Sequence, residues 1–308
     1  MDFPANSQGC LGAAWIAWGF QDLLPARAAE RVSFVQTTPT YRPDVVGRLR
    51  AAGCVFAEDE AALLVAAAAT AEELEALVRR RVSGLPLEHV LGWAEFCGLR
   101  IEVDPAVFVP RRRTEYLVRL AARLLQARGA AGTPVVVDLC CGSGAVGAAL
   151  AAAAGPLELH AADVDPAAAA CARRNLQPLG AEVHEGDLYG PLPERLRGRV
   201  DILAVNAPYV PSGMIGTMPP EARLHEPRVA LDGGPDGLEL QRRVAAAAPE
   251  WLAPGGHLLI ETSRRQAPQT VGIFAGNGLS GRVFSSRRLD ATVVLGSVLA
   301  GVAAGTPR

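Results

Sequence analysis

The chain has 308 residues, of which 50% are hydrophobic and 20% are charged, and its formal net charge is −2. Such a length suits one large α/β domain with a smaller partner, and such a composition excludes a wholly disordered chain. Every positive side chain is an arginine, and the near-neutral charge argues against a dedicated nucleic-acid binder, which would carry a broad basic surface.

The N-terminal third of the chain divides into an irregular stretch and a helical one. Residues 1–40 show no sustained hydrophobic periodicity, and we expect them to be a poorly ordered extension. From residue 44 to residue 84 apolar side chains recur at helical spacing, and the sequence TAEE at residues 70–73 is a capping box that opens a helix. These features predict a small helical domain over residues 41–92.

A change of hydrophobic period follows this helical stretch. Phe96 and Ile101 belong to short extended runs around a turn, and Pro110 ends the extended pattern because proline cannot continue a strand ladder. We therefore predict a β-hairpin linker over residues 93–112.

Residues 113–308 alternate helical and extended patterns. The predicted helices span residues 114–128, 144–154, 166–176 and 237–252. The predicted strands span residues 134–139, 157–162, 200–205 and 257–261, with further candidates near residue 283 and at residues 292–295. This alternation predicts an α/β fold of the Rossmann-like, doubly wound kind, in which ligands bind at the carboxyl ends of the strands.

The first of these strands runs into a glycine-rich loop and then a helix. Gly142, Gly144 and Gly147 let the backbone turn sharply and approach a ligand, a pattern that dinucleotide-binding proteins share. Asp138, just before the loop, would repel a pyrophosphate but suits the positively charged methionine moiety of S-adenosylmethionine. We therefore assign Asp138, Cys140, Gly142 and Gly144 to cofactor binding.

Two further acids follow later strands of the predicted sheet. Asp163 ends a strand 21 residues after Gly142, where a carboxylate can bind the ribose hydroxyls of the cofactor. Asp165 is more simply explained as the cap of the helix that begins at Pro166. Asp187 follows a short strand and is assigned to the exocyclic amine of adenine.

The most specific motif is Asn206-Ala207-Pro208-Tyr209, which directly follows an apolar strand. Amide and aryl amine nitrogens are poor nucleophiles because their lone pairs are delocalised, so a catalyst must hold the NH2 group and orient it. The Asn206 side-chain oxygen and the Ala207 carbonyl can accept its two hydrogens, while Tyr209 stacks on the planar group. These four residues are the predicted catalytic motif, and Asn206 also borders the cofactor.

Taken in order, these motifs resemble class I methyltransferases of the amino-methylating group. Three further segments, at residues 86–92, 108–115 and 226–237, look like the protein-(glutamine-N5) methyltransferases, the HemK-type enzymes that modify a glutamine in peptide-chain release factors or in a ribosomal protein. The similarity covers about residues 43–297.

This resemblance implies an S-adenosylmethionine-dependent enzyme that methylates the side-chain amide nitrogen of a glutamine in a protein, with a release factor as the first candidate substrate. It implies that residues 41–92 recognise this substrate. It also implies that residues 226–237 border the active site and that substrate binding involves Arg111, Thr114 and Glu115 together with Asn206 and Tyr209.

The sequence departs from the family pattern at three places. Ala207 replaces a proline, Arg112 and Arg113 replace a proline and an acid, and Cys140-Cys141 replace Gly-Thr. A backbone carbonyl at residue 207 is retained, so these changes bear on the substrate more than on the reaction. A paralogue that acts on another protein therefore remains open.

Three other functions can be weighed against this one. A short-chain nicotinamide dehydrogenase needs Tyr-x-x-x-Lys, which a chain without lysine cannot have. An adenine-N6 methyltransferase acting on nucleic acid shares the Asn-x-Pro-Tyr logic because the adenine amine is also planar, and it is the main alternative. A non-catalytic binding module of the same fold is the third reading.

The remaining expectations concern environment and partners. Six cysteines without a CxxC pair, and no histidine at metal-ligand spacing, suggest neither a disulfide framework nor a zinc site, so no metal is expected and a cytoplasmic setting is the simplest. The apolar stretch at residues 10–20 is too short to span a bilayer. We expect a monomer without a membrane or a direct nucleic-acid partner.

Overall fold

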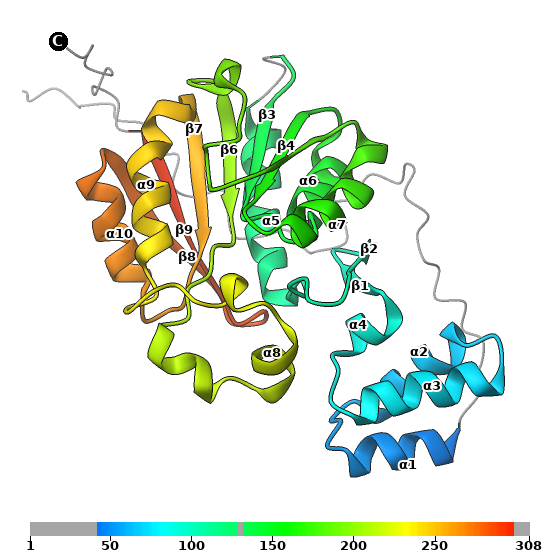
Figure 1. Cartoon of the computed structure of the whole chain (residues 1–308). Coiled ribbons are helices and arrows are strands. Elements are labelled where there is room, and N and C mark those ends of the chain that lie inside the picture. Colours follow the sequence, from blue (N-terminus) through cyan, green and yellow to red (C-terminus); the bar gives the residue numbers. More distant parts are fainter. Residues whose placement is uncertain (1–41, 129–131, 299–308) are drawn as a thin grey trace, which may run out of the picture.

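The structure is a computed structural model that describes residues 42–128 and 132–298. The predicted N-terminal extension, residues 1–40, lies outside the described residues. The described chain begins with a group of helices, continues through a two-stranded hairpin and ends in a seven-stranded sheet covered by helices (Figure 1). None of the described helices is long and apolar enough to cross a bilayer.

The N-terminal helices are α1 (Pro43–Ala51), α2 (Ala57–Ala67), α3 (Ala71–Val82) and α4 (Leu87–Leu91). Their apolar faces close on a small core that includes Leu49, Leu64 and Val78, each almost without solvent exposure. Half of the predicted capping box is present, because Thr70 Oγ1 accepts the N–H of Glu73 at 3.1 Å, whereas the Glu73 carboxylate accepts the N–H of Ala69, the residue before the cap, at 2.7 Å.

A short antiparallel hairpin follows, formed by β1 (Trp93–Phe96) and β2 (Leu99–Glu102). Its two-residue turn consists of Cys97 and Gly98, which both have positive φ, the conformation that matches the twist of a tight hairpin.

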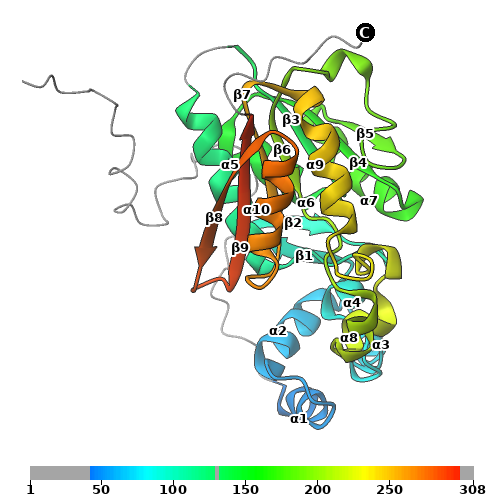
Figure 2. The same cartoon turned by 90° about the vertical axis from the view of Figure 1, so that its left-hand side faces the viewer.

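Side chains tie the N-terminal helices to the rest of the chain at two points. His89 Nε2 lies 2.8 Å from the Val107 carbonyl oxygen. The buried Arg81 guanidinium binds Glu60 within the N-terminal helices and, at 2.6 Å, Glu221 on α8 (Pro220–His225). Figures 1 and 2 both place α8 beside this helical group.

The large sheet has the strand order β5-β4-β3-β6-β7-β9-β8. Its strands are β3 (Val135–Leu139), β4 (Glu158–Asp163), β5 (Glu182–Glu185), β6 (Val200–Val205), β7 (Leu252–Glu261), β8 (Leu279–Ser286) and β9 (Ala291–Val298). The first five run parallel, whereas β9 pairs antiparallel with both β7 and β8. The predicted Rossmann-like α/β fold is therefore confirmed.

Helices cover both faces of this sheet (Figure 2). One face packs against α5 (Glu115–Ala127), α6 (Ala145–Ala154) and α7 (Pro166–Leu176). The other packs against α9 (Glu239–Trp251) and α10 (Ala267–Gly276). Successive residues of β3 enter the two cores in turn, Val136 on one side and Val137 on the other, because side chains alternate along a strand.

The order of the strands fixes where a ligand can bind. From β3 the chain moves outward to β4 and β5, then returns to the other side of β3 to form β6 and β7. The carboxyl ends of β3 and β6 therefore border the switch point of the sheet, the place where open α/β sheets hold their ligands.

Most predicted elements match within a few residues, and α7 coincides with the predicted residues 166–176. Helix α10 was not predicted, because Pro268 is typical of a helix break, but in the structure it occupies the first turn, where its missing N–H costs nothing. It also missed α8, a helix of six residues that is too short to show a period.

Candidate active site

A cavity of about 470 Å³ opens at the carboxyl ends of β3, β4 and β6. This volume suits a small-molecule ligand. Its walls come from the loops after these strands, from the segment before α5 and from the segment before α9. Among its lining residues are Asp138, Cys140, Gly142, Asp163, Asp187, Asn206, Ala207, Pro208 and Tyr209.

The glycine-rich loop forms the floor of the cavity. Cys140 and Gly142 have positive φ and line the cavity. Gly144, also at positive φ, caps α6, and a Cβ at this position would lie 2.8 Å from Leu176 Cδ1. Gly144 itself does not line the cavity. It shapes the turn, because the close packing of α6 and α7 leaves no room for a side chain there. Its role in cofactor binding stays a prediction.

Asp138 lies beneath this loop with 2% of its surface exposed. One carboxyl oxygen, Oδ2, accepts the N–H of Gly147 at 2.8 Å. Burial raises the pKa of Asp138 to about 8, so the carboxyl group is poised to become an anion when a cation arrives beside it. The other oxygen remains available to a ligand in the cavity.

Asp163 ends β4 on the wall of the cavity. Its Oδ2 accepts the N–H of Gly142 at 2.8 Å, and its Oδ1 accepts the N–H of Asp165 at 3.0 Å. Burial raises the pKa of Asp163, and these backbone donors partly oppose that shift. Each oxygen keeps a further lone pair, which suits two vicinal hydroxyls. As predicted, Asp165 caps α7 by accepting the N–H of Ala167 at 2.9 Å.

Asp187 also lines the cavity, but its carboxylate forms an ion pair with Arg243 of α9. The predicted contact with an adenine amine would have to share this carboxylate with the guanidinium. The sequence analysis assigned no role to Arg243, which lines the same part of the cavity.

Asn206 stands at the end of β6 with its side-chain amide facing the start of α5. Its Nδ2 donates a long hydrogen bond, 3.5 Å, to Oγ1 of Thr114, which is 2% exposed. The Thr114 hydroxyl lies beside the buried Glu261 carboxyl group and lowers its pKa, against the larger effect of burial, which raises it. This arrangement directs the amide nitrogen of Asn206 to Thr114 and leaves its oxygen for the cavity.

Tyr209 is held at both ends. Its hydroxyl donates to Glu261 Oε1 at 3.3 Å, and its carbonyl oxygen accepts the N–H of Gln266 Nε2 at 3.0 Å. Burial, with the Glu261 carboxylate, raises the pKa of Tyr209 to about 12, so the phenol stays protonated near neutral pH. This state agrees with the predicted role of the ring as a stacking surface.

The segment at residues 226–237 borders the cavity, as the resemblance implied. The N–H of Val210 donates to the Leu231 carbonyl at 3.1 Å, and that of Gly233 donates to the Val210 carbonyl at 2.9 Å. A Cβ at Gly233 would lie 2.7 Å from the Pro208 carbonyl oxygen, so the two segments pack with no room for a side chain. The packing of this glycine run thus holds the predicted catalytic motif, residues 206–209, in place.

Arg111 and Arg113, which precede α5, contact buried carboxylates of the fold. Arg111 binds both carboxylate oxygens of the fully buried Glu226 side chain at 2.6 Å, and Arg113 Nε lies 3.7 Å from Glu261. Both arginines line the cavity, but each offsets a buried carboxylate that the fold itself supplies. Arg112 is exposed and is not among the residues that line the cavity.

Two further residues that were predicted to bind the substrate differ in their relation to the cavity. Thr114 lines the cavity, whereas Glu115 does not and instead pairs with Arg119 one turn along α5. The assignment of Glu115 to substrate binding stays a prediction. No role was predicted for Glu261 or Gln266, although Glu261 ends the strand next to β6 and that position could have marked it.

Comparisons with known proteins place these residues in context. The family model described as "Methyltransferase small domain" matches residues 99–217. A release factor glutamine methyltransferase of Geobacter sulfurreducens is 42% identical over 212 residues, which are 67% of this chain and 72% of that protein.

A second relative has a different stated substrate. The 4-amino-L-phenylalanine/4-methylamino-L-phenylalanine methyltransferase of Streptomyces pristinaespiralis is 39% identical over 203 residues, 65% of this chain and 69% of that protein. Among solved structures, the hMettl16 catalytic domain in complex with MAT2A 3'UTR hairpin 6 is similar in fold, with a TM-score of 0.51 and 14% identity over 74% of this chain and 84% of that one.

Proposed function

The chain belongs to the protein-(glutamine-N5) methyltransferase family, and from that premise we propose that it methylates the side-chain amide nitrogen of a glutamine in a peptide-chain release factor. The enzyme uses S-adenosylmethionine. A single observation carries the proposal for the site. Asn206 follows β6 at the cavity, and its amide nitrogen is turned to Thr114, which leaves its oxygen to accept a hydrogen bond from the NH2 group that receives the methyl group.

The residues of the cavity fit this cofactor. Asp163 offers a carboxylate, already oriented by two backbone N–H groups, to the ribose hydroxyls. Asp138 offers a buried carboxyl oxygen to the cationic methionine moiety, and Gly142 lets the ligand approach the backbone. When bound, the cofactor supplies a methyl group on a positively charged sulfur.

The chain's own residues then prepare the target nitrogen. Asn206 Oδ1 and the Ala207 carbonyl accept the two amide hydrogens of the substrate, which holds the nitrogen with its lone pair toward the methyl group. Tyr209, fixed by Glu261 and Gln266, stacks on the planar amide. Orientation of this kind can contribute several orders of magnitude to the rate.

A protein substrate suits the surface beside the cavity. Met214, Leu224 and Val229 are 46%, 63% and 50% exposed, and Val229 also lines the cavity. The Arg81–Glu221 ion pair connects α8, which carries Leu224, with the N-terminal helices. We assign the recognition of the protein partner to residues 41–92 together with α8, and the hairpin region, residues 93–112, to the link with residues 113–308.

The setting and assembly follow from this substrate. Peptide-chain release factors act where translation ends, so the proposed setting is the cytoplasm. We also propose a monomer as the active form.

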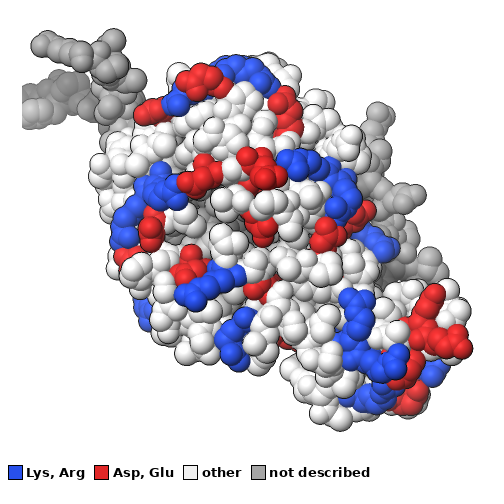
Figure 3. All heavy atoms as spheres, viewed as in Figure 1, with Lys and Arg blue, Asp and Glu red and all other residues white. Residues whose placement is uncertain are grey.

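A second candidate acceptor is the aromatic amine of a free amino acid. It is favoured by the Streptomyces pristinaespiralis relative, whose identity to this chain approaches that of the release factor enzymes. An aryl amine is planar and has a delocalised lone pair, so the same Asn206 and Tyr209 arrangement would serve it. A nucleic-acid acceptor is less well supported, since positive and negative side chains are interspersed over the face seen in Figure 3.

A direct assay separates these acceptors. The purified full chain would be incubated with S-adenosylmethionine and either a recombinant release factor or 4-aminophenylalanine, and the products analysed by mass spectrometry. We expect the release factor to gain one methyl group on a glutamine, and this gain to disappear in the Asn206→Ala enzyme. Methylation of the free amino acid alone would establish the second candidate and refute the first.

A further inference from the structure

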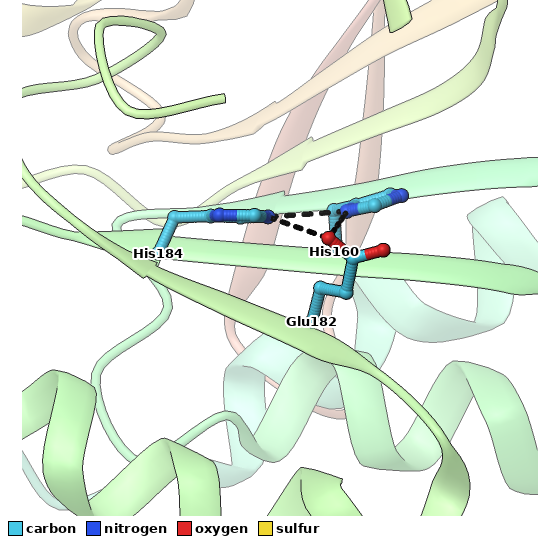
Figure 4. A group of neighbouring side chains, drawn as sticks. All are labelled: His160, Glu182 and His184. Carbon is cyan, nitrogen blue, oxygen red and sulfur yellow. Dashed lines mark hydrogen bonds and ion pairs between the residues drawn. The ribbon is translucent and has the colours of Figure 1, made fainter. Parts of the chain in front are cut away.

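A compact group of possible metal ligands lies on the face of the sheet covered by α9 and α10, at the edge formed by β4 and β5. It consists of His160, Glu182 and His184 (Figure 4). His160 pairs with Glu182 across the two parallel strands, and His184 follows Glu182 by two residues, so the three side chains share one face of the sheet. None of them takes part in the cavity or in the proposed reaction.

The three potential ligand atoms form a small triangle. His160 Nδ1 lies 3.1 Å from His184 Nε2 and 3.9 Å from Glu182 Oε2, and His184 Nε2 lies 4.0 Å from the same oxygen. In the plane of the three atoms, the point equidistant from them is about 2.1 Å from each, within the range of Zn–N and Zn–O bonds. The three atoms are therefore close enough together to bind one ion.

A fourth residue orients the most buried ligand. His160 Nε2 lies 3.2 Å from Glu158 Oε1, so an N–H at Nε2 donates to this carboxylate and Nδ1, which lies against His184 Nε2, carries the lone pair. Carboxylates hold metal-binding histidines in this way and fix their tautomer. The arrangement is a second observation that points to a ligand, independent of the triangle itself.

Arginines complete the outer layer of the group. Arg195 donates to Glu182 Oε1 at 2.6 Å, which leaves Oε2 directed at the two imidazoles. Arg199 donates to Glu158 Oε2 at 3.3 Å, which leaves Oε1 for His160. Each carboxylate thus has one oxygen held by a cation and the other facing a histidine.

The two histidines face each other through one ring nitrogen each, His160 Nδ1 and His184 Nε2. The two rings are stacked with their centres 5.4 Å apart. Without a metal, one N–H must lie between the two facing nitrogens, and that single hydrogen bond leaves Glu182 Oε2 outside it at 3.9–4.0 Å.

We propose that His160, Glu182 and His184 bind a divalent transition-metal ion of the Zn²⁺ type, with water as the fourth ligand. The Glu182 side chain is 53% exposed, which gives the ion access and leaves a side of the site open to water. The ion would fasten β5, an edge strand of four residues, to β4. Its role would be structural, next to the strand ends that carry Asp163 and Asp187.

Calorimetric titration of the full chain with Zn²⁺, after removal of bound metal with a chelator, tests the proposal. We expect a single equivalent to bind and to raise the unfolding temperature, because a ligand of the folded state stabilises it. Glu182→Gln and His184→Gln should each weaken binding by at least about tenfold, and Glu158→Gln by about 10- to 100-fold through the loss of His160 orientation. Glu182 is partly exposed, so its variant tests the site even if His184→Gln does not fold.

Two controls separate this site from other zinc ligands. His257→Gln removes a histidine that contacts Ser297 on a distant strand, and it should leave the affinity unchanged. Cobalt substitution reports the donor atoms, since a nitrogen and oxygen set gives tetrahedral visible bands without a sulfur-to-cobalt band. Affinity that is equal in wild type and Glu182→Gln, a sulfur-to-cobalt band, or no binding by wild type would overturn the proposal.

Discussion

The two halves of the cavity are built in different ways. In the cofactor half, the carboxylates of Asp138 and Asp163 are oriented by backbone N–H groups only 9 and 21 residues away. In the acceptor half, side chains contact side chains across 115 residues between Arg111 and Glu226, and across 92 between Thr114 and Asn206. The first half depends on the local path of the chain, the second on how distant segments pack.

This difference has an energetic consequence. In the cofactor half, a changed side chain leaves one buried backbone N–H, such as that of Gly147, without its acceptor, which costs about 1–3 kcal/mol. In the acceptor half, removal of Arg111 leaves the buried Glu226 carboxylate without its cation, and an uncompensated buried charge costs more. The acceptor half should therefore be the more sensitive half in both activity and stability.

The largest effect is expected for Asn206→Ala. It removes the oxygen that is proposed to hold the substrate nitrogen, and we expect kcat to fall by about 10²- to 10³-fold, the usual loss for one oriented transition-state contact. Cofactor affinity, measured by calorimetry, should change little because its main contacts lie in the other half. Near wild-type turnover would show that the residue is structural and would remove the contrast between the halves.

Asp138→Asn should act on the cofactor half alone. We expect the affinity for S-adenosylmethionine to fall by about tenfold, since one charged contact to a cation is lost. Because kcat is measured at saturation, it should fall much less than affinity. A loss of kcat as large as that of Asn206→Ala would contradict the separation of roles.

The same residue gives a dependence on pH. The folded-state pKa of Asp138, about 8, lies above the value near 4 in an unfolded chain. Its contribution to stability is therefore fully present below about pH 4 and is lost as the pH rises toward 8. Cofactor affinity should increase over the upper part of this window, because the bound cation favours the carboxylate. Both trends should be smaller in Asp138→Asn than in wild type, because Asp163, Glu226 and Glu261 also have raised pKa values, and urea unfolding and calorimetry at several pH values can show the difference.

Arg111→Ala tests the ion pairs of the acceptor half. It leaves the buried Glu226 carboxylate without its cation, and we expect a loss of about 2 kcal/mol in the free energy of unfolding, reduced from larger values because Arg111 is 30% exposed. The double variant with Glu226→Gln should recover part of this loss. The exposed Arg112→Ala is the matched control and should change stability by less than about 0.5 kcal/mol.

The smallest effect is expected for Tyr209→Phe. This change removes only the hydrogen bond to Glu261 and keeps the ring that is proposed to stack on the substrate. Turnover should stay within about fivefold of wild type, a cost of about 1 kcal/mol for one hydrogen bond. Tyr209→Ala should reduce turnover much further. Equal losses in the two variants would assign the function to the hydroxyl group.

Much of the cofactor half could be read from the sequence. Asp138, Cys140, Gly142 and Asp163 line the cavity as predicted, because a strand that runs into a glycine turn and a helix places its residues by local geometry. The same locality explains why α7 and its cap at Asp165 match the prediction. Asn206 to Tyr209 were found for the same reason, since they directly follow a strand.

Only the tertiary structure decided the partners of these residues. The contacts of Arg111 with Glu226, of Asp187 with Arg243 and of Tyr209 with Glu261 join segments whose separation in sequence carries no signal. The same holds for the cluster at His160, where two neighbouring strands bring together residues that no ligand-spacing pattern connects. Local backbone preferences are set by a few adjacent residues, whereas side-chain pairing depends on strand order and helix packing, which are fixed only when the whole sheet assembles.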